Sequence, residues 1–497
     1  MSETAIARPA LTPPSLGSLA SVLAVPALGI AGFGVATAVL PSDRIALVGL
    51  SIATLTLILV VVAIDRSRPR ERRNLLLTIF SFSYAVFFVV PVFLYYAGEI
   101  GYIHEISPNP SPIPLTPADV ARGTLAVLLG YVALLLGYTL PLGKVISHIV
   151  PRMRREWSAE AAIGVALVTI PMGWSVIFAS QFRLIPRELG NGVLGVIASG
   201  TSVGIALLAI CYQRYRSPAA LLLLALVIPP TMFFNFFTSS KMLFVLPIVM
   251  VVVVHVIVTR RLRVWWIAGF LVLMALFYPV AQFYRDLLYS TGERNFVLHM
   301  VTRPAQIFKL LGAFVSSFHL ADYFWTGMDA TFRRLEGLSI LTVIVRDTGS
   351  RVPFQGGWSI AQIAIAYIPR VLWPGKPVVG TGGFITEYYG YGPGLETSTG
   401  STWLGEFYMN FGWMGIAIGM TVIGVFFRFL QESFLGTDAT IPAMLVGVVA
   451  LLSLSANIGG DLVVSFNTVG FAIAPVVLAH LFVRTLTPRP ARLPPPL

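Results

Sequence analysis

The sequence predicts an all-α polytopic membrane protein with about 12 transmembrane helices, and three observations carry that prediction. Of its 497 residues, 56% are hydrophobic and only 11% are charged, whereas about a quarter of a typical soluble domain is charged. Apolar runs of roughly 17 to 25 residues recur along the chain, and a run of that length crosses a bilayer as a helix. Basic residues alternate between successive loops, as they do in multi-pass membrane proteins.

The expected spans form two groups, nine before a long loop and three after it. They are 17–40, 45–64, 75–97, 119–141, 159–180, 193–212, 218–236, 242–258, 264–283, 403–427, 440–457 and 462–483. The first run is longer than the apolar core of a signal peptide, which is about 7 to 15 residues. We therefore expect it to be a retained helix.

The basic residues predict the orientation, because Lys and Arg collect in cytoplasmic loops. With the N-terminus inside, the inner segments hold nineteen basic residues, and the short outer loops and outer helix ends hold five. Loops 65–73, 144–156 and 259–263 carry most of the inner charge. We expect both termini to be cytoplasmic. The single cysteine, Cys211, excludes an internal disulfide framework.

Three parts of the chain follow from this topology. Residues 1–283 are expected to form an N-terminal transmembrane bundle of about nine spans. Residues 284–402 form a large outer segment, which we expect to carry the active site. Residues 403–497 form about three further spans and a cytoplasmic tail.

The outer segment contains ten basic residues that the positive-inside pattern does not explain, since long loops are translocated largely regardless of charge. They are Arg285, Arg294, Arg303, Lys309, Arg333, Arg334, Arg346, Arg351, Arg370 and Lys376. Stretches 301–325, 337–347 and 358–373 of the same segment alternate apolar runs with isolated charges. Because irregular backbone at membrane depth must be buried or line a watery cavity, we expect interfacial or re-entrant helices there.

Polar residues elsewhere also predict a cavity that opens outward. Loop 98–119 has five prolines, which favour an extended, rigid chain and would form a rim. Asn457, Asp461 and Asn467 surround the start of the last span, where polar groups are costly unless they face a partner or water.

A basic cluster on the outer face suits a lipid-linked phosphate or pyrophosphate, because the planar guanidinium matches phosphate oxygens. Alternatively, any single arginine would pair with an acidic residue of the same segment, such as Glu336 or Asp347, or contact lipid headgroups.

Residues 354–424 resemble the bacterial oligosaccharide repeat-unit polymerases of the Wzy type, which make O-antigen and exopolysaccharide. The matching pieces are FQGGW, Ile368-Pro369-Arg370, Trp373-Pro374, Lys376-Pro377, Thr402 with Gly405-Glu406, Asn410-Phe411-Gly412 and Gly415, with Arg333-Arg334-Leu335 upstream. Outside about 280–430 the similarity is one of hydropathy and number of spans.

The resemblance implies a membrane glycosyltransferase of the GT-C kind, in the bacterial inner membrane. It would join undecaprenyl-pyrophosphate-linked oligosaccharide units on the periplasmic face, with no nucleotide sugar, cofactor or metal. A chain-length regulator and a flippase are further candidate partners. The six histidines form no tight ligand set, and no nucleotide-binding fingerprint is present, so neither nucleic acid nor a nucleotide is an expected partner.

The chemistry that the resemblance implies is attack by a sugar hydroxyl on an anomeric carbon, with lipid pyrophosphate as the leaving group. Fixed positive charge would stabilise that leaving group. We expect Arg370 and Arg333 to act in catalysis, and Lys376, Arg334 and Arg285 to bind the substrate.

Glu406 is the candidate general base, because it begins a span at the outer surface. A helix-start carboxylate favoured by the macrodipole is the alternative.

Aromatic and amide side chains complete the predicted site. Trp373, Tyr388 and Trp403 are expected to contact the substrate, with interfacial anchoring as the alternative. Asn410 is a further predicted binding residue. The glycine-rich stretch 380–384 is expected to be a flexible hinge.

Three other classes of function remain open. An O-antigen ligase would use a similar lipid donor and transfer the glycan to a lipid A core. A polysaccharide or lipid transporter would need no chemistry, and such proteins often contain internal repeats with broken helices. No repeat is apparent in this sequence. A purely structural membrane subunit would not need the basic outer segment.

Overall fold

The computed structural model describes most of the chain outside the long outer segment. The described residues are 16–39, 42–96, 115–150, 153, 155–181, 184, 193–236, 241–261, 335–368, 372–389, 400–455 and 457–486, with isolated positions between 265 and 332. All secondary structure in these ranges is helical, apart from one isolated bridge between Thr348 and Val352.

The helices of the first half follow the predicted spans closely. They are α1 (Leu16–Val39), α2 (Ser42–Ser67), η1 (Arg70–Arg72), α3 (Leu75–Tyr84), η2 (Ala85–Val89), η3 (Val92–Tyr96), α5 (Pro117–Thr139), α6 (Leu142–Ile149), α7 (Ala159–Gln181), α8 (Val193–Tyr215), α9 (Pro218–Phe236) and α10 (Lys241–Thr259). The second half contains α15 (Leu338–Asp347), α16 (Trp358–Ile365), α17 (Gly382–Tyr388), α18 (Trp403–Phe434), α19 (Ile441–Ala450), η5 (Leu451–Ser455) and α20 (Leu462–Leu486).

Eight helices in the described ranges are long and apolar enough to cross a membrane. They are Arg44–Ser67, Leu75–Leu94, Pro117–Thr139, Ala159–Ser180, Leu194–Tyr215, Pro218–Asn235, Trp403–Phe434 and Leu462–Val483. Three shorter apolar helices, Pro26–Val35, Leu243–Thr259 and Ile441–Ser455, fall on three other predicted spans. The remaining span, 264–283, lies outside the described residues except for isolated positions. An all-α multi-pass membrane protein is therefore confirmed, and the count of twelve stays a prediction.

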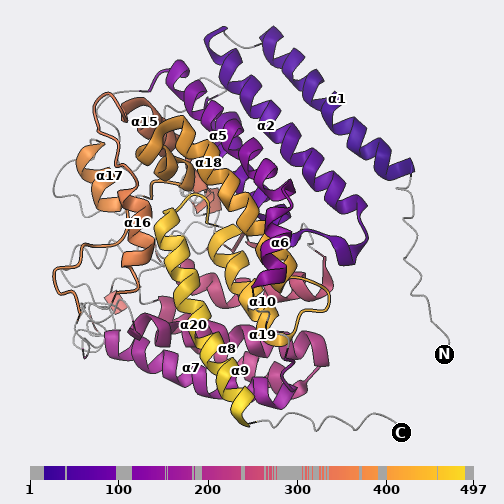
Figure 1. Cartoon of the computed structure of the whole chain (residues 1–497), viewed down its shortest axis with the longest axis vertical. Helices are drawn as coiled ribbons and strands as arrows, with labels where there is room; N and C mark the ends of the chain where they lie inside the picture. Colours follow the sequence, from indigo (N-terminus) through magenta and orange to yellow (C-terminus); the bar gives the residue numbers. More distant parts are fainter. Residues whose placement is uncertain are drawn as a thin grey trace.

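The helices form one bundle with α5 and α18 near its middle (Figure 1). Helix α1 lies at the edge and packs on α2, which in turn packs on α5. Helices α7, α8, α9 and α10 form the opposite part of the bundle, where α20 packs on α8. The short helices α15, α16 and α17 gather on one side (Figure 1).

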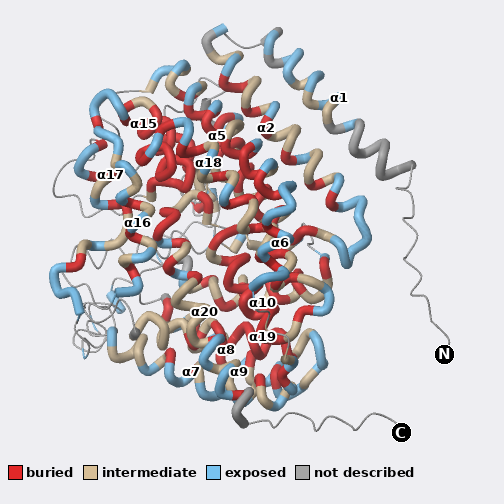
Figure 2. The backbone as a smooth tube through the Cα atoms, viewed as in Figure 1, coloured by how far each residue is buried: buried red, intermediate tan, exposed pale blue. Residues whose placement is uncertain are grey.

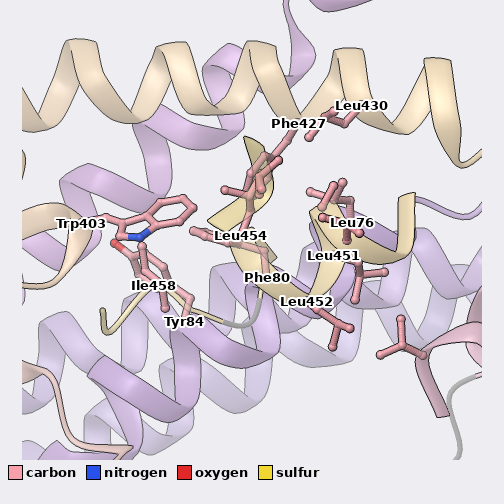
Figure 3. Close-up of a cluster of buried hydrophobic side chains, with 14 of the residues drawn as sticks. Leu76, Phe80, Tyr84, Trp403, Phe427, Leu430, Leu451, Leu452, Leu454 and Ile458 are labelled. Carbon is pink, nitrogen blue, oxygen red and sulfur yellow. The ribbon is translucent and has the colours of Figure 1, made fainter. Parts of the chain in front are cut away.

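The core lies where α3, α18 and η5 meet, and buried residues concentrate in the same middle region (Figure 2). The Phe80 ring packs edge-on against Phe427, with the centroids 5.0 Å apart, and also contacts Trp403 (Figure 3). Helices α5 and α18 approach closely through glycines. A Cβ on Gly137 would lie 1.9 Å from the Thr421 carbonyl oxygen, so small residues permit this packing.

Parts of the predicted inner loops 65–73, 144–156 and 259–263 meet residues 212–216 and 435–440 at one end of the bundle. We call this end the basic end (residues 65–73, 155–156, 212–216, 259–261 and 435–440). Arg73 Nη1 donates to the Arg260 carbonyl at 3.4 Å, and Arg260 Nη2 donates to the Leu435 carbonyl. Arg214 donates to the Ala439 carbonyl at 3.1 Å and pairs with Glu156 at 3.3 Å. The shared end agrees with the predicted alternation of loops. The side of a membrane that it faces stays a prediction.

Candidate functional site

Helix α18 is broken after two turns, at the NFG motif. Phe411 (φ −142°, ψ 17°) and Gly412 (φ 62°, ψ −145°) are not helical. A Cβ on Gly415 would lie 2.2 Å from the Phe407 carbonyl oxygen, a contact that a continuous helix cannot make across eight residues. The chain therefore folds back, with residues 403–410 packed beside 413–434. The predicted span 403–427 falls on a helix that is long and apolar enough to cross a membrane, but the apolar pattern continues across a backbone break that only glycine readily adopts and so gave no sign of it.

The first arm of α18 begins at a strained residue. Thr402 has φ 60° and ψ 156°, a region that costs a non-glycine residue on the order of 1–3 kcal/mol. Two hydrogen bonds hold it, since its hydroxyl accepts from the Gly405 amide at 3.1 Å and the Trp403 amide donates to the Ile458 carbonyl at 3.1 Å. The start of α18 is thereby fixed against the break between η5 and α20.

Glu406, the predicted base, is fully buried in the first turn of α18. Its Oε2 accepts from the Leu462 amide at 2.9 Å, and the Ser401 hydroxyl donates to the same oxygen at 3.4 Å. Its Oε1 meets the distance and angle requirements of a hydrogen bond with none of the described residues, while the Ser359 hydroxyl and the Val463 amide lie near the carboxyl. Glu406 is a helix-start carboxylate, as the alternative held, but the amide that it accepts from belongs to another helix, α20.

Asp461 lies beside Glu406 and joins two further segments to it. Its Oδ1 accepts from the Ser401 amide at 2.8 Å, from the Ser401 hydroxyl at 3.2 Å and from the Thr381 hydroxyl. Its Oδ2 accepts from the Thr381 amide at 3.0 Å. We call Thr381, Ser401, Glu406 and Asp461 the carboxylate hub. Its two carboxylates stand at the starts of α17, α18 and α20, where the macrodipole favours negative charge.

Asn410 connects the hub to α16. Its Oδ1 accepts from the Gly357 amide at 2.8 Å, and its Nδ2 donates to the Ser359 hydroxyl and the Glu406 carbonyl, each at 2.7 Å. Gly357, the N-cap of α16, has φ 94°. Asn410 is therefore buried and fully engaged with protein groups, and its predicted contact with substrate stays a prediction.

The glycine-rich stretch 380–384 is hydrogen-bonded to neighbouring segments at Gly380 and Thr381, and its predicted role as a flexible hinge stays a prediction. The Gly380 amide donates to Gln362 Oε1 at 2.9 Å, and Thr381 is held by Asp461. At the other end of α17, the Tyr389 hydroxyl lies 2.8 Å from the Thr348 hydroxyl. Burial raises the pKa of Tyr389 to about 12, so its phenol stays neutral near pH 7 and hydrogen-bonds α17 to the end of α15.

Lys376 lies in the loop between α16 and α17 and is buried. Its ammonium donates to the Ala366 carbonyl at 2.7 Å and to the Ile368 carbonyl at 2.9 Å. These bonds hold the chain two residues before Arg370. Lys376 thus supports the turn in this conformation, and its predicted contact with substrate stays a prediction.

The three predicted aromatic residues lie in different surroundings. Trp403 is in the core, packed on Phe80 and Phe427 (Figure 3). Its Nε1 donates to the Ser465 hydroxyl at 3.3 Å. Trp373 is 38% exposed and Tyr388 is 49% exposed. The structure therefore leaves Trp373 and Tyr388 accessible, whereas Trp403 holds the first arm of α18 in place.

The arginines divide into described and undescribed sets. Arg346 and Arg351 both pair with Asp347, at 2.7 Å and 3.2 Å, as the ion-pair alternative predicts. The arginines of the outer segment that lie outside the described part of the chain are Arg285, Arg294, Arg303, Arg333, Arg334 and Arg370. Their roles stay predictions.

Sequence reasoning identified Glu406 and Asn410 but missed Ser401 and Thr381. Asp461 was recognised only as a costly polar residue near a span. The signal that marks all three is a polar residue beside an interruption of the apolar pattern, at 380–382, 400–402 and 457–461.

The fold and the hub together define a multi-pass helical membrane protein with a broken helix and a buried pair of carboxylates. A family model described as a domain of unknown function, DUF8712, matches residues 40–436. Because the match covers well over half of the sequence, the chain belongs to this family. Searches of curated proteins and of solved structures each gave no match. The matched region contains Glu406 and Asn410 and ends before Asp461.

Proposed function

We propose that the chain polymerises undecaprenyl-pyrophosphate-linked oligosaccharide units into O-antigen or exopolysaccharide, by metal-independent glycosyl transfer on the periplasmic face of the bacterial inner membrane. The observation that carries the proposal is the buried Glu406 carboxyl with its unpartnered Oε1. A general base needs an oxygen that is free to accept the proton of the attacking hydroxyl.

The residues behind the resemblance support the proposal, because they include Glu406 and several residues that hold it in place. Thr402 caps α18, Gly412 permits the reversal of the chain, and Asn410 links Glu406 to α16. Gly405 lies against Ile344, and a Cβ on Gly405 would lie 2.7 Å from the Ile344 Cδ1 atom. A site shared with the polymerases that the sequence resembles would require the motif residues to fix Glu406 in this way.

The reaction assigns a task to each group. The acceptor hydroxyl donates to Glu406 Oε1, its oxygen bonds to the anomeric carbon, and the bond from that carbon to pyrophosphate oxygen breaks. The proton passes to Glu406, and the electron pair leaves with the lipid pyrophosphate. Arg370 and Arg333, with Arg334 and Arg285, would stabilise the charge on that leaving group.

The acceptor is expected to bind at the carboxylates, and the pyrophosphate away from them. The amides of Thr381, Ser401 and Leu462 are already occupied by carboxylate oxygens, so these positions would repel a phosphate and suit a neutral hydroxyl. Glu406 is fully buried. Binding of the acceptor therefore requires the surrounding segments to separate, as in other enzymes that close over their substrates.

The experiment is incubation of the purified protein with undecaprenyl-pyrophosphate-linked oligosaccharide alone, followed by sizing of the products. We expect a ladder of chain lengths without added metal or nucleotide. Arg370→Ala and Arg333→Ala should each abolish the ladder at normal protein levels. An inactive wild-type protein would refute the proposal, and unchanged ladders in both variants would remove the two arginines from it. A single transfer to an added lipid A core, with no ladder, would identify a ligase.

A transporter is the second candidate, favoured by the break in α18. Broken helices whose ends face a central site are common in transporters. Reconstitution in vesicles separates the two candidates, because a transporter would move the lipid-linked glycan across the bilayer and leave its length unchanged.

A further inference from the structure

Asp461 makes more hydrogen bonds to distant segments than a residue that merely starts α20 would need. Four donors reach its carboxylate, the amides and hydroxyls of Thr381 and Ser401. These two residues lie 80 and 60 positions away in the sequence. Helix starts are ordinarily capped by groups within three or four residues. The Asp461 carboxylate instead joins the start of α17 to the residue before the first arm of α18.

The same contacts determine which Glu406 oxygen is free. The Ser401 hydroxyl lies between the two carboxylates, 3.2 Å from Asp461 Oδ1 and 3.4 Å from Glu406 Oε2. The Leu462 amide, which directly follows Asp461, donates to Glu406 Oε2 at 2.9 Å. Of the two donors to Oε2, the Ser401 hydroxyl is therefore held by Asp461, and the Leu462 amide belongs to the residue that follows Asp461 in the chain. With Oε2 engaged, Oε1 is left to accept a proton.

We propose that Asp461 is a positioning residue for Glu406, which it holds, through Ser401 and the start of α20, with Oε1 presented to the acceptor hydroxyl. This inference rests on the proposed function. Asp461 itself touches no reacting atom. Its bonds to Thr381 also attach α17, and with it the exposed Tyr388, to the same centre.

The chemistry of an amide replacement shows why the negative charge is needed. The two carboxylate oxygens accept from the Thr381 amide, the Thr381 hydroxyl and the Ser401 amide, and they share the single Ser401 hydroxyl proton with Glu406 Oε2. An Asn side chain has one acceptor oxygen and an NH₂ group that only donates. In Asp461→Asn, either the Thr381 amide or the Ser401 amide would face another donor. One of the two segments would therefore be released, and Ser401 would lose its fixed position beside Glu406.

The test compares Asp461→Asn with wild-type protein by steady-state kinetics on lipid-linked oligosaccharide. We expect kcat to fall on the order of 10- to 100-fold, as displacement of a reacting group by about 1 Å does, with KM little changed. Thr381→Val should lower kcat in the same direction, and Thr381→Ser should restore part of the loss. Asp438→Asn, an exposed residue at the basic end, is the matched control and should behave as wild type.

A second readout does not depend on activity. Hydrogen exchange of the full-length protein should be faster in Asp461→Asn for peptides that contain the Thr381 and Ser401 amides, and unchanged for peptides from α5. Ser401→Ala keeps Asp461 and removes the shared hydroxyl. Ser401→Ala should lower kcat less than Asp461→Asn does. It replaces Asp461→Asn in the kinetic test if that variant is not stably folded.

The outcomes separate this inference from the proposed function. A wild-type kcat in Asp461→Asn, together with faster exchange at Thr381 and Ser401, would overturn the positioning role and leave the polymerase proposal intact. If the wild-type protein makes no polymer, the polymerase proposal fails and takes the role in catalysis with it. Unchanged hydrogen exchange in Asp461→Asn would show that Asp461 does not hold Thr381 and Ser401 in place, whether or not the wild-type protein makes polymer.

Discussion

The two ends of the helical bundle satisfy their helix termini with opposite charges. At the basic end, arginine guanidinium groups donate to main-chain carbonyls, as Arg260 does to Leu435 and Arg214 to Ala439. At the opposite end, carboxylates accept from main-chain amides, as Asp461 does from Thr381 and Glu406 from Leu462. Arg260 beside the end of α18, and Asp461 and Glu406 at the starts of α20 and α18, each have the sign that the helix macrodipole favours at that position.

The two ends differ in the chemistry of the buried polar group that has no hydrogen-bond partner. At the basic end, Arg260 Nη1 has no partner among the described residues. A guanidinium group cannot give up its proton in a protein. At the other end the unpartnered buried atoms include Ser455 Oγ, Asn467 Oδ1 and Glu406 Oε1, and the last of these is a carboxylate oxygen that can take up a proton. The comparison predicts that changes at the basic end alter stability, and that changes at the carboxylate hub alter turnover.

The largest effect is expected from Gly412→Ala, which affects the backbone that folds α18 back beneath the hub. The backbone angles of Gly412 are ones that only glycine readily adopts, so a side chain costs on the order of 1–3 kcal/mol. The nearest atoms to a new Cβ belong to Phe354, at 3.5 Å, which is ordinary contact. The loss therefore comes from the backbone. We expect a lower Tm in a thermal unfolding assay and loss of polymer.

Gly383→Ala is the matched control for that change. Gly383 lies in α17 with open space around its Cβ position and an ordinary negative φ, so alanine should be neutral or slightly stabilising there. Equal losses in both variants would show that the break in α18 has no special importance.

A loss of similar size in stability, with no loss of turnover, is expected from Arg260→Met at the basic end. The change removes a charged hydrogen bond to the Leu435 carbonyl, which is worth about 1.5–3 kcal/mol. Arg261→Met, at an exposed neighbouring position, is the control. Thermal unfolding should show a lower Tm for Arg260→Met only, while kcat of the remaining folded protein stays at the wild-type value. A reduced kcat at full stability would contradict the contrast between the two ends.

The smallest effect is a pH dependence of stability from Glu336, which lies on the same side of the bundle as the hub. Its carboxyl accepts from the Ser339 amide at 2.6 Å at the start of α15, and burial raises its pKa from 4.5 to about 7. Between these values the folded protein keeps a proton that the unfolded chain has released. Raising the pH across this range therefore favours unfolding. Tm should fall from pH 5 to pH 8 more steeply in wild type than in Glu336→Gln, and parallel curves would refute this assignment.

Much of the architecture could be predicted from the sequence, because span length and loop charge follow directly from the bilayer. The spans before residue 260 and the grouping of the inner loops at one end both agree with the structure. Glu406 was identified because it begins a span at the outer surface, and Asp461 drew notice because a polar group near the start of a span is costly.

Long-range pairing could not be predicted in this way. Hydropathy continues through Phe411 and Gly412, so nothing in composition marks the reversal of α18. The contacts of Asp461 with Thr381 and Ser401 join positions far apart in the sequence, and span patterns carry no information about such contacts. Trp403 illustrates the same limit, because an aromatic residue at a span end suits either the interface or the core, and packing on Phe80 places it in the core.

The most direct test of the central claim is the turnover of Glu406→Gln in purified, folded protein. Glutamine keeps the size of the side chain and an acceptor for the Leu462 amide, but it cannot take up a proton. The account predicts that kcat falls on the order of 100-fold or more, as loss of a general base does, while binding of the lipid-linked donor is retained. Wild-type turnover in Glu406→Gln would contradict the account.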